Sequence, residues 1–514
     1  MHDFLNMLKK FLKNIALVLF LNLLIKPFWI LGIDRSVQNI VGVEDYGFYY
    51  SIFSFSFLLN ILLDFGITNF NNKNIAQNNH LLRKHLSSII VLKLLLGGVY
   101  LLLSIVCAFI IRYNSLQILL LIVLAFNQFL ISFVLYLRSN LSGLHLFKVD
   151  SFISVLDRTI MIVVCAVLLW GNLPITFSIR WYAFAQTFAY MLTAIITLII
   201  VFKKAKSKFL KLKWNLPFSI MIIKKSFPFA VLVLLMTFYN RIDSVMLERM
   251  LPDASDPTAG MHSGEMQSGI YASAYRLLDA TNMIAYLFSI LLLPLFAKMI
   301  KYKESVESLV RLAFSLLFVG AIIVSLCSFF YSREIMEMLY PRNIHVIQGC
   351  IAENPAEYFQ RIAESSKVFG LLMGCFVPIS TTYVFGSLLT ANGNLKQLNI
   401  MAVSGMITNI LLNVFLIPRF FATGSAFASF ITQFTTSIIQ VIIVQHIFKF
   451  KVNFRFLFSL VIFVAGVLVV GYLSRQFNYS WTINIMIMVA LSGLLAMALR
   501  IISFRKMFEI IKNG

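Results

Sequence analysis

The sequence predicts an all-α protein that crosses a membrane many times. The chain has 514 residues, of which 60% are hydrophobic and 12% are charged, and its mean hydropathy is +0.87. A soluble domain has about 25% charged residues, so this composition excludes an ordinary soluble protein. Apolar segments also recur along the whole chain. Each is close to the roughly 20 residues that a helix needs to cross a bilayer.

By that length, the apolar segments predict about fourteen transmembrane helices. They are expected near residues 14–34, 47–67, 87–111, 116–137, 152–170, 177–202, 227–247, 268–295, 309–331, 367–390, 398–417, 424–447, 455–473 and 481–502. Lys26 and Pro27 interrupt the first of these spans.

The basic residues predict the orientation of the chain. The formal net charge is +22, and most of the 43 Lys and Arg residues fall in loops on the side of the N-terminus. Cytoplasmic loops carry an excess of Lys and Arg, so we expect both termini in the cytoplasm. The basic charge then reflects topology and contact with anionic membrane lipids, and no nucleic-acid partner is expected.

The sequence indicates no cofactor and no metal site. Four of the five cysteines lie in apolar segments, and none forms a CxxC or zinc-type spacing. No ATP-binding motif is visible either. If the protein moves a molecule across the membrane, we therefore expect this movement to be driven by an ion gradient, by the membrane potential or by downstream consumption of that molecule.

The connections divide the chain into four parts. We expect an N-lobe of six helices at 1–202 and a C-lobe of six helices at 226–447. A basic amphipathic linker at 203–225 is expected to lie on the cytoplasmic leaflet between them. Residues 448–514 supply two further helices and a cytoplasmic tail. A short surface helix is expected around 352–366, in the outer loop 332–366.

Corresponding parts of the two lobes are similar. Residues 33–37 end the first span and Tyr46–Tyr49 open the second, while residues 242–245 end the seventh span and Gly269–Tyr271 open the eighth. Many transporters are built from such repeats, with the substrate site between the halves. The pattern favours an internal repeat over chance similarity at the ends of apolar helices.

Charged residues inside the predicted spans are the main candidates for function. A charge at the centre of a bilayer costs about 2.5–3.5 kcal/mol on insertion scales, so it persists where it meets water or a charged ligand. As cations that line a transport cavity we expect Lys26, Arg241 and Arg276. As coupling or gating residues we expect Asp34, Asp157, Arg158, Asp243 and Asp279.

Each candidate also has a purely structural interpretation. Lys26 can extend its ammonium to the membrane interface. Arg276 and Asp279 are three residues apart on one helix face, so they can form a neutral ion pair. Asp157 and Arg158 are neighbours whose side chains are expected to diverge, so they need partners on other helices, either in a cytoplasmic gate or in a contact that stabilises the fold.

The order of short motifs along the chain resembles that of a known family. They are Tyr46-Gly47-Phe48-Tyr49, Asp64-Phe65-Gly66-Ile67, Arg138-Ser139-Asn140-Leu141-Ser142-Gly143, Asp157-Arg158, Arg241-Ile242-Asp243 and Arg276-Leu277-Leu278-Asp279. In these, the whole chain resembles the Wzx-type flippases of O-antigen and capsule repeat units. Those flippases form part of the polysaccharide transporter family, in the superfamily that includes the multidrug and toxin extrusion (MATE) antiporters and the lipid II flippase.

The resemblance implies a fold and a function. The fold would be two six-helix lobes in a V shape with two additional C-terminal helices, working by alternating access as a monomer in the bacterial cytoplasmic (inner) membrane. The cargo would be a polyprenyl-pyrophosphate-linked oligosaccharide, and other membrane proteins of polysaccharide assembly would be partners. In the lipid II flippase, cations on the first, second and eighth helices line the cavity. Here Lys26 and Arg276 match two of these, whereas the second helix has no cation in its apolar body, and Arg241 is the candidate replacement.

Two other functions remain open at this point. A cation-coupled multidrug antiporter of the same superfamily needs an anionic pocket, whereas the spans here hold comparable numbers of acids and cations. A glycan polymerase or ligase needs a catalytic cluster on an outer loop. The loop 332–366 carries five glutamates but no recognisable motif, so no catalytic residue and no enzyme activity are predicted.

Overall fold

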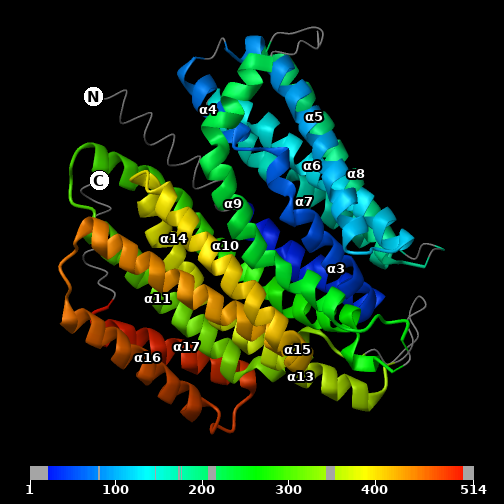
Figure 1. Cartoon of the computed structure of the whole chain (residues 1–514). Coiled ribbons are helices and arrows are strands. Elements are labelled where there is room, and N and C mark those ends of the chain that lie inside the picture. Colours follow the sequence, from blue (N-terminus) through cyan, green and yellow to red (C-terminus); the bar gives the residue numbers. More distant parts are fainter. Residues whose placement is uncertain are drawn as a thin grey trace. The chain divides into compact units, whose positions relative to one another are not determined.

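The computed structural model confirms an all-helical fold built for a membrane (Figure 1). The structure describes residues 21–78, 81–144, 146–171, 174, 176–205, 216–256, 258–342 and 353–501. Within these residues there is no β-strand, and 11 helices are long and apolar enough to cross a membrane. The candidate spans lie in α5 (Leu81–Ile110), α6 (Ser115–Gly143), α7 (Phe147–Trp170), α8 (Ile179–Ala205), α9 (Leu216–Met250), α10 (Gly264–Lys301), α11 (Glu307–Phe330), α13 (Pro355–Gly374) with α14 (Phe376–Ala391), α15 (Leu395–Phe448), α16 (Phe454–Ser474) and α17 (Trp481–Ala498).

The predicted number of spans stays a prediction, because helices and spans do not correspond one to one. The 54-residue α15 covers both expected spans 398–417 and 424–447, with a break at Phe421 (φ 52°, ψ −136°). The first expected span, 14–34, is described from residue 21 onward; this part is helical and ends in the π-helix η1 (Trp29–Asp34). After α2 (Arg35–Val41), the second expected span, 47–67, contains most of α3 (Val43–Leu58) and the 3-10 helix η2 (Asn60–Leu63), and α4 (Ile67–Gln77) follows.

Contacts within the chain define two compact units, which we describe separately. Of the described residues, unit 1 contains those up to Gly269 and unit 2 those from Ile270 onward. The predicted lobe boundaries, the internal repeat and the V shape stay predictions. Of the predicted linker 203–225, residues 206–215 lie outside the described residues, whereas 203–205 end α8 and 216–225 begin α9.

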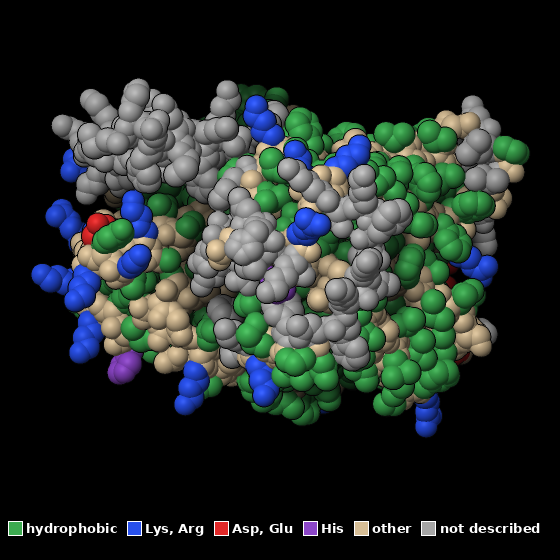
Figure 2. All heavy atoms as spheres, turned by 90° about the horizontal axis from the view of Figure 1, so that it is seen from above, with side chains coloured by type: hydrophobic (Ala, Val, Ile, Leu, Met, Phe, Trp, Pro, Cys, Tyr) green, Lys and Arg blue, Asp and Glu red, His purple; other side chains and the backbone are tan. Residues whose placement is uncertain are grey.

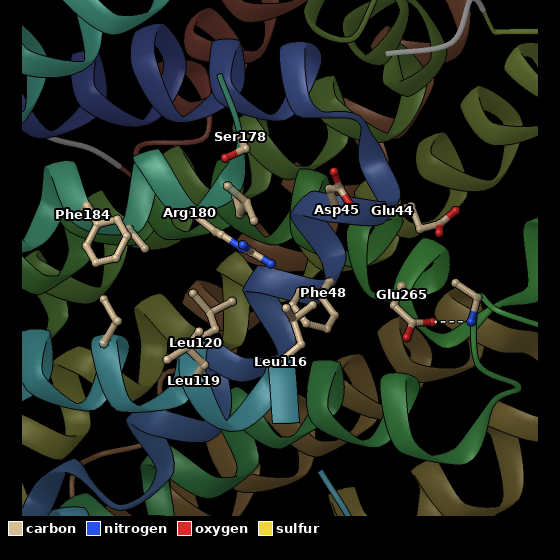
Figure 3. A pocket seen from close by; sticks show the side chains of 14 residues that line it. Glu44, Asp45, Phe48, Leu116, Leu119, Leu120, Ser178, Arg180, Phe184 and Glu265 are labelled. Carbon is tan, nitrogen blue, oxygen red and sulfur yellow. Dashed lines mark hydrogen bonds between the residues drawn. The ribbon is translucent and has the colours of Figure 1, made fainter. Parts of the chain in front are cut away.

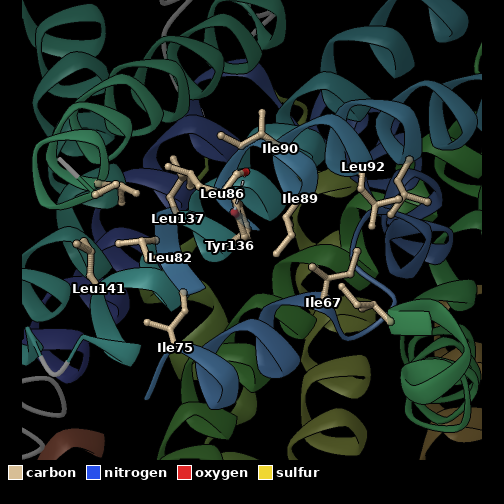
Figure 4. Packing of buried hydrophobic residues seen from close by; sticks show 14 of the residues in the cluster. Ile67, Ile75, Leu82, Leu86, Ile89, Ile90, Leu92, Tyr136, Leu137 and Leu141 are labelled. Carbon is tan, nitrogen blue, oxygen red and sulfur yellow. Dashed lines mark hydrogen bonds between the residues drawn. The ribbon is translucent and has the colours of Figure 1, made fainter. Parts of the chain in front are cut away.

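Unit 1 packs around α6. This helix contacts α3, α4, α5, α7 and α8, and Figure 1 shows α5, α6 and α8 side by side. A buried hydrophobic cluster joins α4, α5 and α6 (Figure 4). Its members include Ile67, Ile75, Leu86, Ile89, Tyr136, Leu137 and Leu141. Because lipid is as apolar as these side chains, close packing is the main source of cohesion between the helices.

Unit 2 packs around α11, which contacts α13, α14, α16 and α17. Figure 1 shows α16 and α17, coloured orange to red, along α11. Tyr331, at the end of α11, hydrogen-bonds Ser474 at the end of α16, with 2.8 Å between the hydroxyl oxygens. The surface helix expected around 352–366 is the first part of α13, which continues to Gly374. Within it Arg361 is 6% exposed and pairs with Glu353 at 2.7 Å.

The surface matches a lipid environment. On the face drawn in Figure 2, hydrophobic side chains cover broad areas, and several Lys and Arg side chains gather along the left edge. Leu102, Phe109 and Ile110 on α5 are 64–73% exposed. Soluble monomers rarely expose contiguous apolar surface of this kind. The exposed apolar helices therefore indicate a multi-pass membrane protein.

Candidate functional site

The buried carboxylate of Asp34 lies at the centre of a polar network inside unit 1. Asp34 ends the π-helix η1 and is 2% exposed. Tyr46 on α3 donates a hydrogen bond to its Oδ2 at 2.8 Å, and Tyr182 on α8 donates a short hydrogen bond to its Oδ1. Both carboxyl oxygens are thereby satisfied, as a buried polar group requires.

The local sequence explains how Asp34 reaches this place. Pro27 lacks a backbone N–H, so it weakens regular helix in the first predicted span, and the following residues form η1. Short π-helical turns inside α-helices are frequent at functional sites. After Asp34, α2 ends at Gly42, whose φ of 92° is a conformation that favours glycine. This turn starts α3, which carries Tyr46.

Aromatic rings connect Asp34 with Arg158 on α7. Trp29 of η1 stacks on Tyr182 with 6.0 Å between ring centroids. The Arg158 guanidinium lies 5.7 Å from the centroid of Trp29 and 5.7 Å from that of Tyr190 on α8. A guanidinium at this distance is attracted to the face of a ring. The cation is therefore held by aromatic side chains of two other segments.

Asp157 and Arg158 also contact each other. The distance between Arg158 Nε and Asp157 Oδ2 is 3.7 Å, so the prediction that these neighbours diverge is wrong. Backbone directions alone suggested divergence, but the arginine side chain is long enough to fold back toward its neighbour. Lys26 lies within electrostatic reach of both residues and is partly buried. The structure thus brings two predicted gating residues and one predicted cavity cation together.

Arg241 on α9 is connected to Asp34 through two tyrosines of α3. Its Nη1 donates to the Tyr50 hydroxyl at 3.1 Å, and its guanidinium lies 5.5 Å from the ring centroid of Phe57. Tyr50 stacks on Tyr46, with ring centroids 6.2 Å apart, and Tyr46 binds Asp34. Asp243, two residues further along α9, is fully buried in unit 1.

The remaining two predicted residues belong to unit 2. Arg276 and Asp279 lie on α10 and are both partly buried. Asp279 is within electrostatic reach of the Tyr383 hydroxyl on α14. Tyr383 in turn packs edge-on against Tyr286 of α10, with ring centroids 6.2 Å apart.

Sequence reasoning missed a buried ion pair where the second predicted span breaks. Lys93 lies inside α5 and is 1% exposed. Its ammonium donates to Asp64 Oδ1 at 2.5 Å, to the Leu63 carbonyl at 2.9 Å and to the Ser132 hydroxyl at 2.9 Å. The available signal was a lysine several residues inside the expected span 87–111.

A second cluster that the sequence did not reveal lies at the end of α9. Glu248 is 3% exposed and accepts a hydrogen bond from Gln117 of α6 at 2.6 Å. Arg249 binds the same carboxylate and lies 4.9 Å from the ring centroid of Tyr113. A Glu-Arg pair at the end of an apolar helix usually belongs to the interface with water. Only the fold shows that Glu248 turns inward.

The fold and the buried charges define the class of the protein. The fold is similar to "Lipid II flippase MurJ, inward closed conformation", with a TM-score of 0.66 and 14% identity over 91% of this chain and 96% of that chain. It is also similar to an inward-facing multidrug resistance MATE family transporter of the MOP superfamily, with a TM-score of 0.59 and 14% identity over 84% of this chain and 98% of that chain. A MOP superfamily transporter from Pyrococcus furiosus gives a TM-score of 0.54 and 12% identity over 85% and 96% of the two chains. The protein is a membrane protein that shares the fold of these transporters.

The sequence assigns the chain within this class. Residues 11–300, more than half of the chain, match the family described as polysaccharide biosynthesis protein. The chain belongs to this family, which confirms the resemblance found in its motifs. No curated protein sequence matches the chain.

Proposed function

We propose that the protein is a flippase that moves a polyprenyl-pyrophosphate-linked oligosaccharide from the cytoplasmic to the outer leaflet for the synthesis of a surface polysaccharide such as O-antigen or capsule. The observation that carries this proposal is the network of cations and aromatic rings in unit 1. Membership of a polysaccharide biosynthesis family and likeness to a lipid II flippase support it.

The cations suit a ligand that must be bound and then released. Lys26, Arg241 and Arg276 are partly exposed, so each keeps some contact with solvent or ligand. Transport requires binding that is favourable enough for entry and weak enough for exit. Two or three partly solvated cations meet this requirement better than a dense cluster would. The two negative charges of a pyrophosphate are the matching partner.

The aromatic and hydroxyl groups beside Arg241 suit the glycan. Tyr50 and Phe57 flank its guanidinium. A ring face covers the apolar face of a sugar, and a phenol hydroxyl can donate and accept hydrogen bonds. A sugar next to the pyrophosphate would meet these groups first.

The proposed coupling and gating residues are Asp34, Asp157 and Arg158. Further candidates are Asp243 and Asp279. Asp34 is held by Tyr46 from α3 and Tyr182 from α8, so a change in its protonation would alter contacts of three segments at once. The Asp157–Arg158 contact, 3.7 Å long, is loose enough to open and close. We place both termini in the cytoplasm of a bacterium and expect a working monomer.

The direct test is deletion of the gene, followed by analysis of lipid-linked oligosaccharides on each face of the inner membrane. We expect the lipid-linked unit to accumulate on the cytoplasmic face while the surface glycan is lost. Translocated but unpolymerised units would contradict the proposal and indicate a role in polymerisation.

A cation-coupled multidrug antiporter is the second candidate. The observation in its favour is Asp34, a buried carboxylate that could bind a proton or a cation, in a fold that is also similar to MATE transporters. An unchanged glycan in the deletion strain, together with raised drug resistance on expression, would favour this function.

A further inference from the structure

A pocket of about 520 Å³ opens at one end of unit 1, and its lining residues Asp45 and Ala183 directly precede or follow the tyrosines that bind Asp34 (Figure 3). The starts of α3, α6, α8 and α10 form its walls. Pockets that bind small molecules typically have about 300–1,000 Å³. This end of the unit is the one that the charge distribution predicts to face the outside of the cell.

One wall of the pocket is apolar and continues into the lipid-facing surface. Leu116 and Leu119 on α6 and Phe184 on α8 line it and are 45–57% exposed. Trp181 beside them is 44% exposed, and tryptophan is enriched where a membrane meets water. An occupant of this wall is therefore an acyl chain or another apolar group that comes from the bilayer.

The other wall carries opposite charges that do not pair. In Figure 3, Arg180 reaches from the start of α8 toward the first turn of α3, which bears Glu44 and Asp45. In the part of the chain that the structure describes, these three side chains form no hydrogen bond or ion pair. Partial burial raises the pKa of both carboxyl groups, which precede the predicted span 47–67.

Helix stability accounts for only part of this arrangement. Glu44 and Asp45 in the first turn of α3 stabilise the helix, because the N-terminal end of a helix is partly positive. By the same rule, Arg180 at the start of α8 is unfavourable. Arg180 is exposed beside an apolar wall, so its guanidinium is free to reach an anionic group of a molecule bound there.

We propose that this pocket binds the headgroup of a phospholipid with a primary amine, namely phosphatidylethanolamine. The Arg180 guanidinium can bind the phosphate with two parallel hydrogen bonds. The ammonium group has three N–H donors for Glu44 and Asp45. The acyl chains lie along Leu116, Leu119 and Phe184.

The acidic side of the pocket selects the amine. Glu265 of α10 also lines the pocket, and its Oε2 accepts a hydrogen bond from the Ala254 backbone N–H at 3.0 Å. The pocket thus has three carboxylates and one arginine in its lining, which disfavours an anionic lipid such as phosphatidylglycerol. Phosphatidylcholine has no N–H donors, so it loses the hydrogen bonds to Glu44 and Asp45.

The test is lipid binding by the purified full chain in detergent, measured by native mass spectrometry. Phosphatidylethanolamine, phosphatidylcholine and phosphatidylglycerol with identical acyl chains are supplied one at a time. We expect phosphatidylethanolamine to be retained best. Arg180→Gln and the double variant Glu44→Gln/Asp45→Asn should each weaken its binding about tenfold, as loss of a charge-assisted hydrogen bond implies.

Arg83→Gln is the matched control, because Arg83 is exposed on α5 and does not line the pocket. It should leave binding unchanged. Equal retention of the three lipids, or insensitivity to both pocket variants, would overturn the proposal. Tight phosphatidylglycerol binding that depends on Arg180 alone would overturn it too, because the occupant would then be an anionic lipid. If Arg180→Gln does not fold, the double carboxyl variant decides. The proposed cargo uses other residues, so the two proposals stand or fall separately.

Discussion

Gly47 of α3 and Gly269 of α10 meet in a direct backbone contact inside unit 1. A β-carbon on Gly47 would lie 1.9 Å from the Glu265 carbonyl oxygen and 2.5 Å from the Gly269 nitrogen. A β-carbon on Gly269 would lie 2.0 Å from the Val43 carbonyl oxygen. Small residues allow membrane helices to approach this closely. The two glycines also occupy corresponding positions of the predicted repeat, where each opens a span.

Substitution of Gly47 should disrupt this helix crossing. Gly47→Ala places a methyl group against backbone atoms, which cannot move aside by changing rotamer. Overpacking typically costs about 1–3 kcal/mol, and we expect Gly47→Ala to lower the free energy of unfolding by an amount at the upper end of this range. The measurement is the amount of folded protein in the membrane and its thermal midpoint in detergent. Gly98→Ala on α5 is the matched control, since nothing lies within 4 Å of its added methyl group. Equal behaviour of the two variants would contradict the close crossing.

The hydrogen bond from Tyr182 should stabilise the protein through Asp34. Tyr182→Phe leaves one oxygen of a buried carboxylate without this donor, and a hydrogen bond to a charged group contributes about 1.5–3 kcal/mol. We expect a lower thermal midpoint and, if Asp34 couples transport, a changed pH profile of glycan export. Tyr472→Phe on α16, where the ring is 63% exposed, should change neither. A Tyr182→Phe protein with the native midpoint would argue against a structural role for this bond.

The ion pair between Asp64 and Lys93 should respond unequally to loss of either partner. Asp64→Asn keeps an acceptor for Thr68 (Oγ1 to Oδ1, 2.5 Å) but leaves the buried Lys93 ammonium without its counter-charge. Breaking a buried pair in this way costs about 3–5 kcal/mol.

Lys93→Met removes the buried charge itself, and Asp64 remains 27% exposed, so we expect Lys93→Met to reduce stability less than Asp64→Asn does. The double variant Asp64→Asn/Lys93→Met should be more stable than Asp64→Asn alone. A double-mutant cycle of thermal midpoints measures this coupling, and strictly additive losses would show that the pair has no joint role.

Removal of the proposed cavity cations should block transport without unfolding the protein. Lys26→Ala, Arg241→Ala and Arg276→Ala are each expected to reduce surface glycan without lowering the amount of protein in the membrane. Arg455→Ala is the control, because Arg455 is exposed on α16. Normal export in all three variants would refute the proposed cationic cavity.

Acidification should release the lipid from the proposed headgroup pocket. Partial burial raises the pKa of Glu44 and Asp45, so both become neutral at a higher pH than an ordinary carboxyl group. The ammonium then loses these two partners, while Arg180 stays charged. The other acids near the pocket are Glu265 and Asp253, and hydrogen bonds from Ser255 lower the pKa of Asp253, so it stays ionised to a lower pH.

We therefore expect phosphatidylethanolamine binding to be strong at neutral pH and to fall as the pH drops through the raised pKa values. The variant Glu44→Gln/Asp45→Asn should bind weakly at every pH. Native mass spectrometry across a pH series measures both, and wild-type binding that does not vary with pH would exclude these carboxyl groups as the amine partners.

Hydropathy predicted the helical membrane class, because a bilayer imposes one length and one composition on every span. It could not predict where helices break. Pro418 follows directly after the expected span 398–417, yet helical structure continues past it to the break at Phe421. Within the second expected span, α3 ends at Leu58, the 3-10 helix η2 follows, and the chain then turns through positive φ at Phe65 and Gly66.

The candidate residues could be predicted from charge alone, but their partners could not. Asp34 stood out as an acid near the end of an apolar span. Its partners Tyr46 and Tyr182 lie 12 and 148 residues away, and tyrosines in membrane helices give no sign of what they contact. The same applies to Lys93, whose role depends on a helix break that hydropathy does not register.

Lys93 also shows what a membrane-embedded cation can do besides handle a ligand. Where η2 gives way to Asp64, the Leu63 carbonyl receives its hydrogen bonds from the Lys93 ammonium and the Ser132 hydroxyl. The ammonium thus stands in for backbone amides that a continuous helix would have provided, in a medium with no water to replace them. At this position the property that matters is the number of N–H bonds a side chain can offer. Arginine is therefore a closer functional substitute for Lys93 than any neutral residue of the same length.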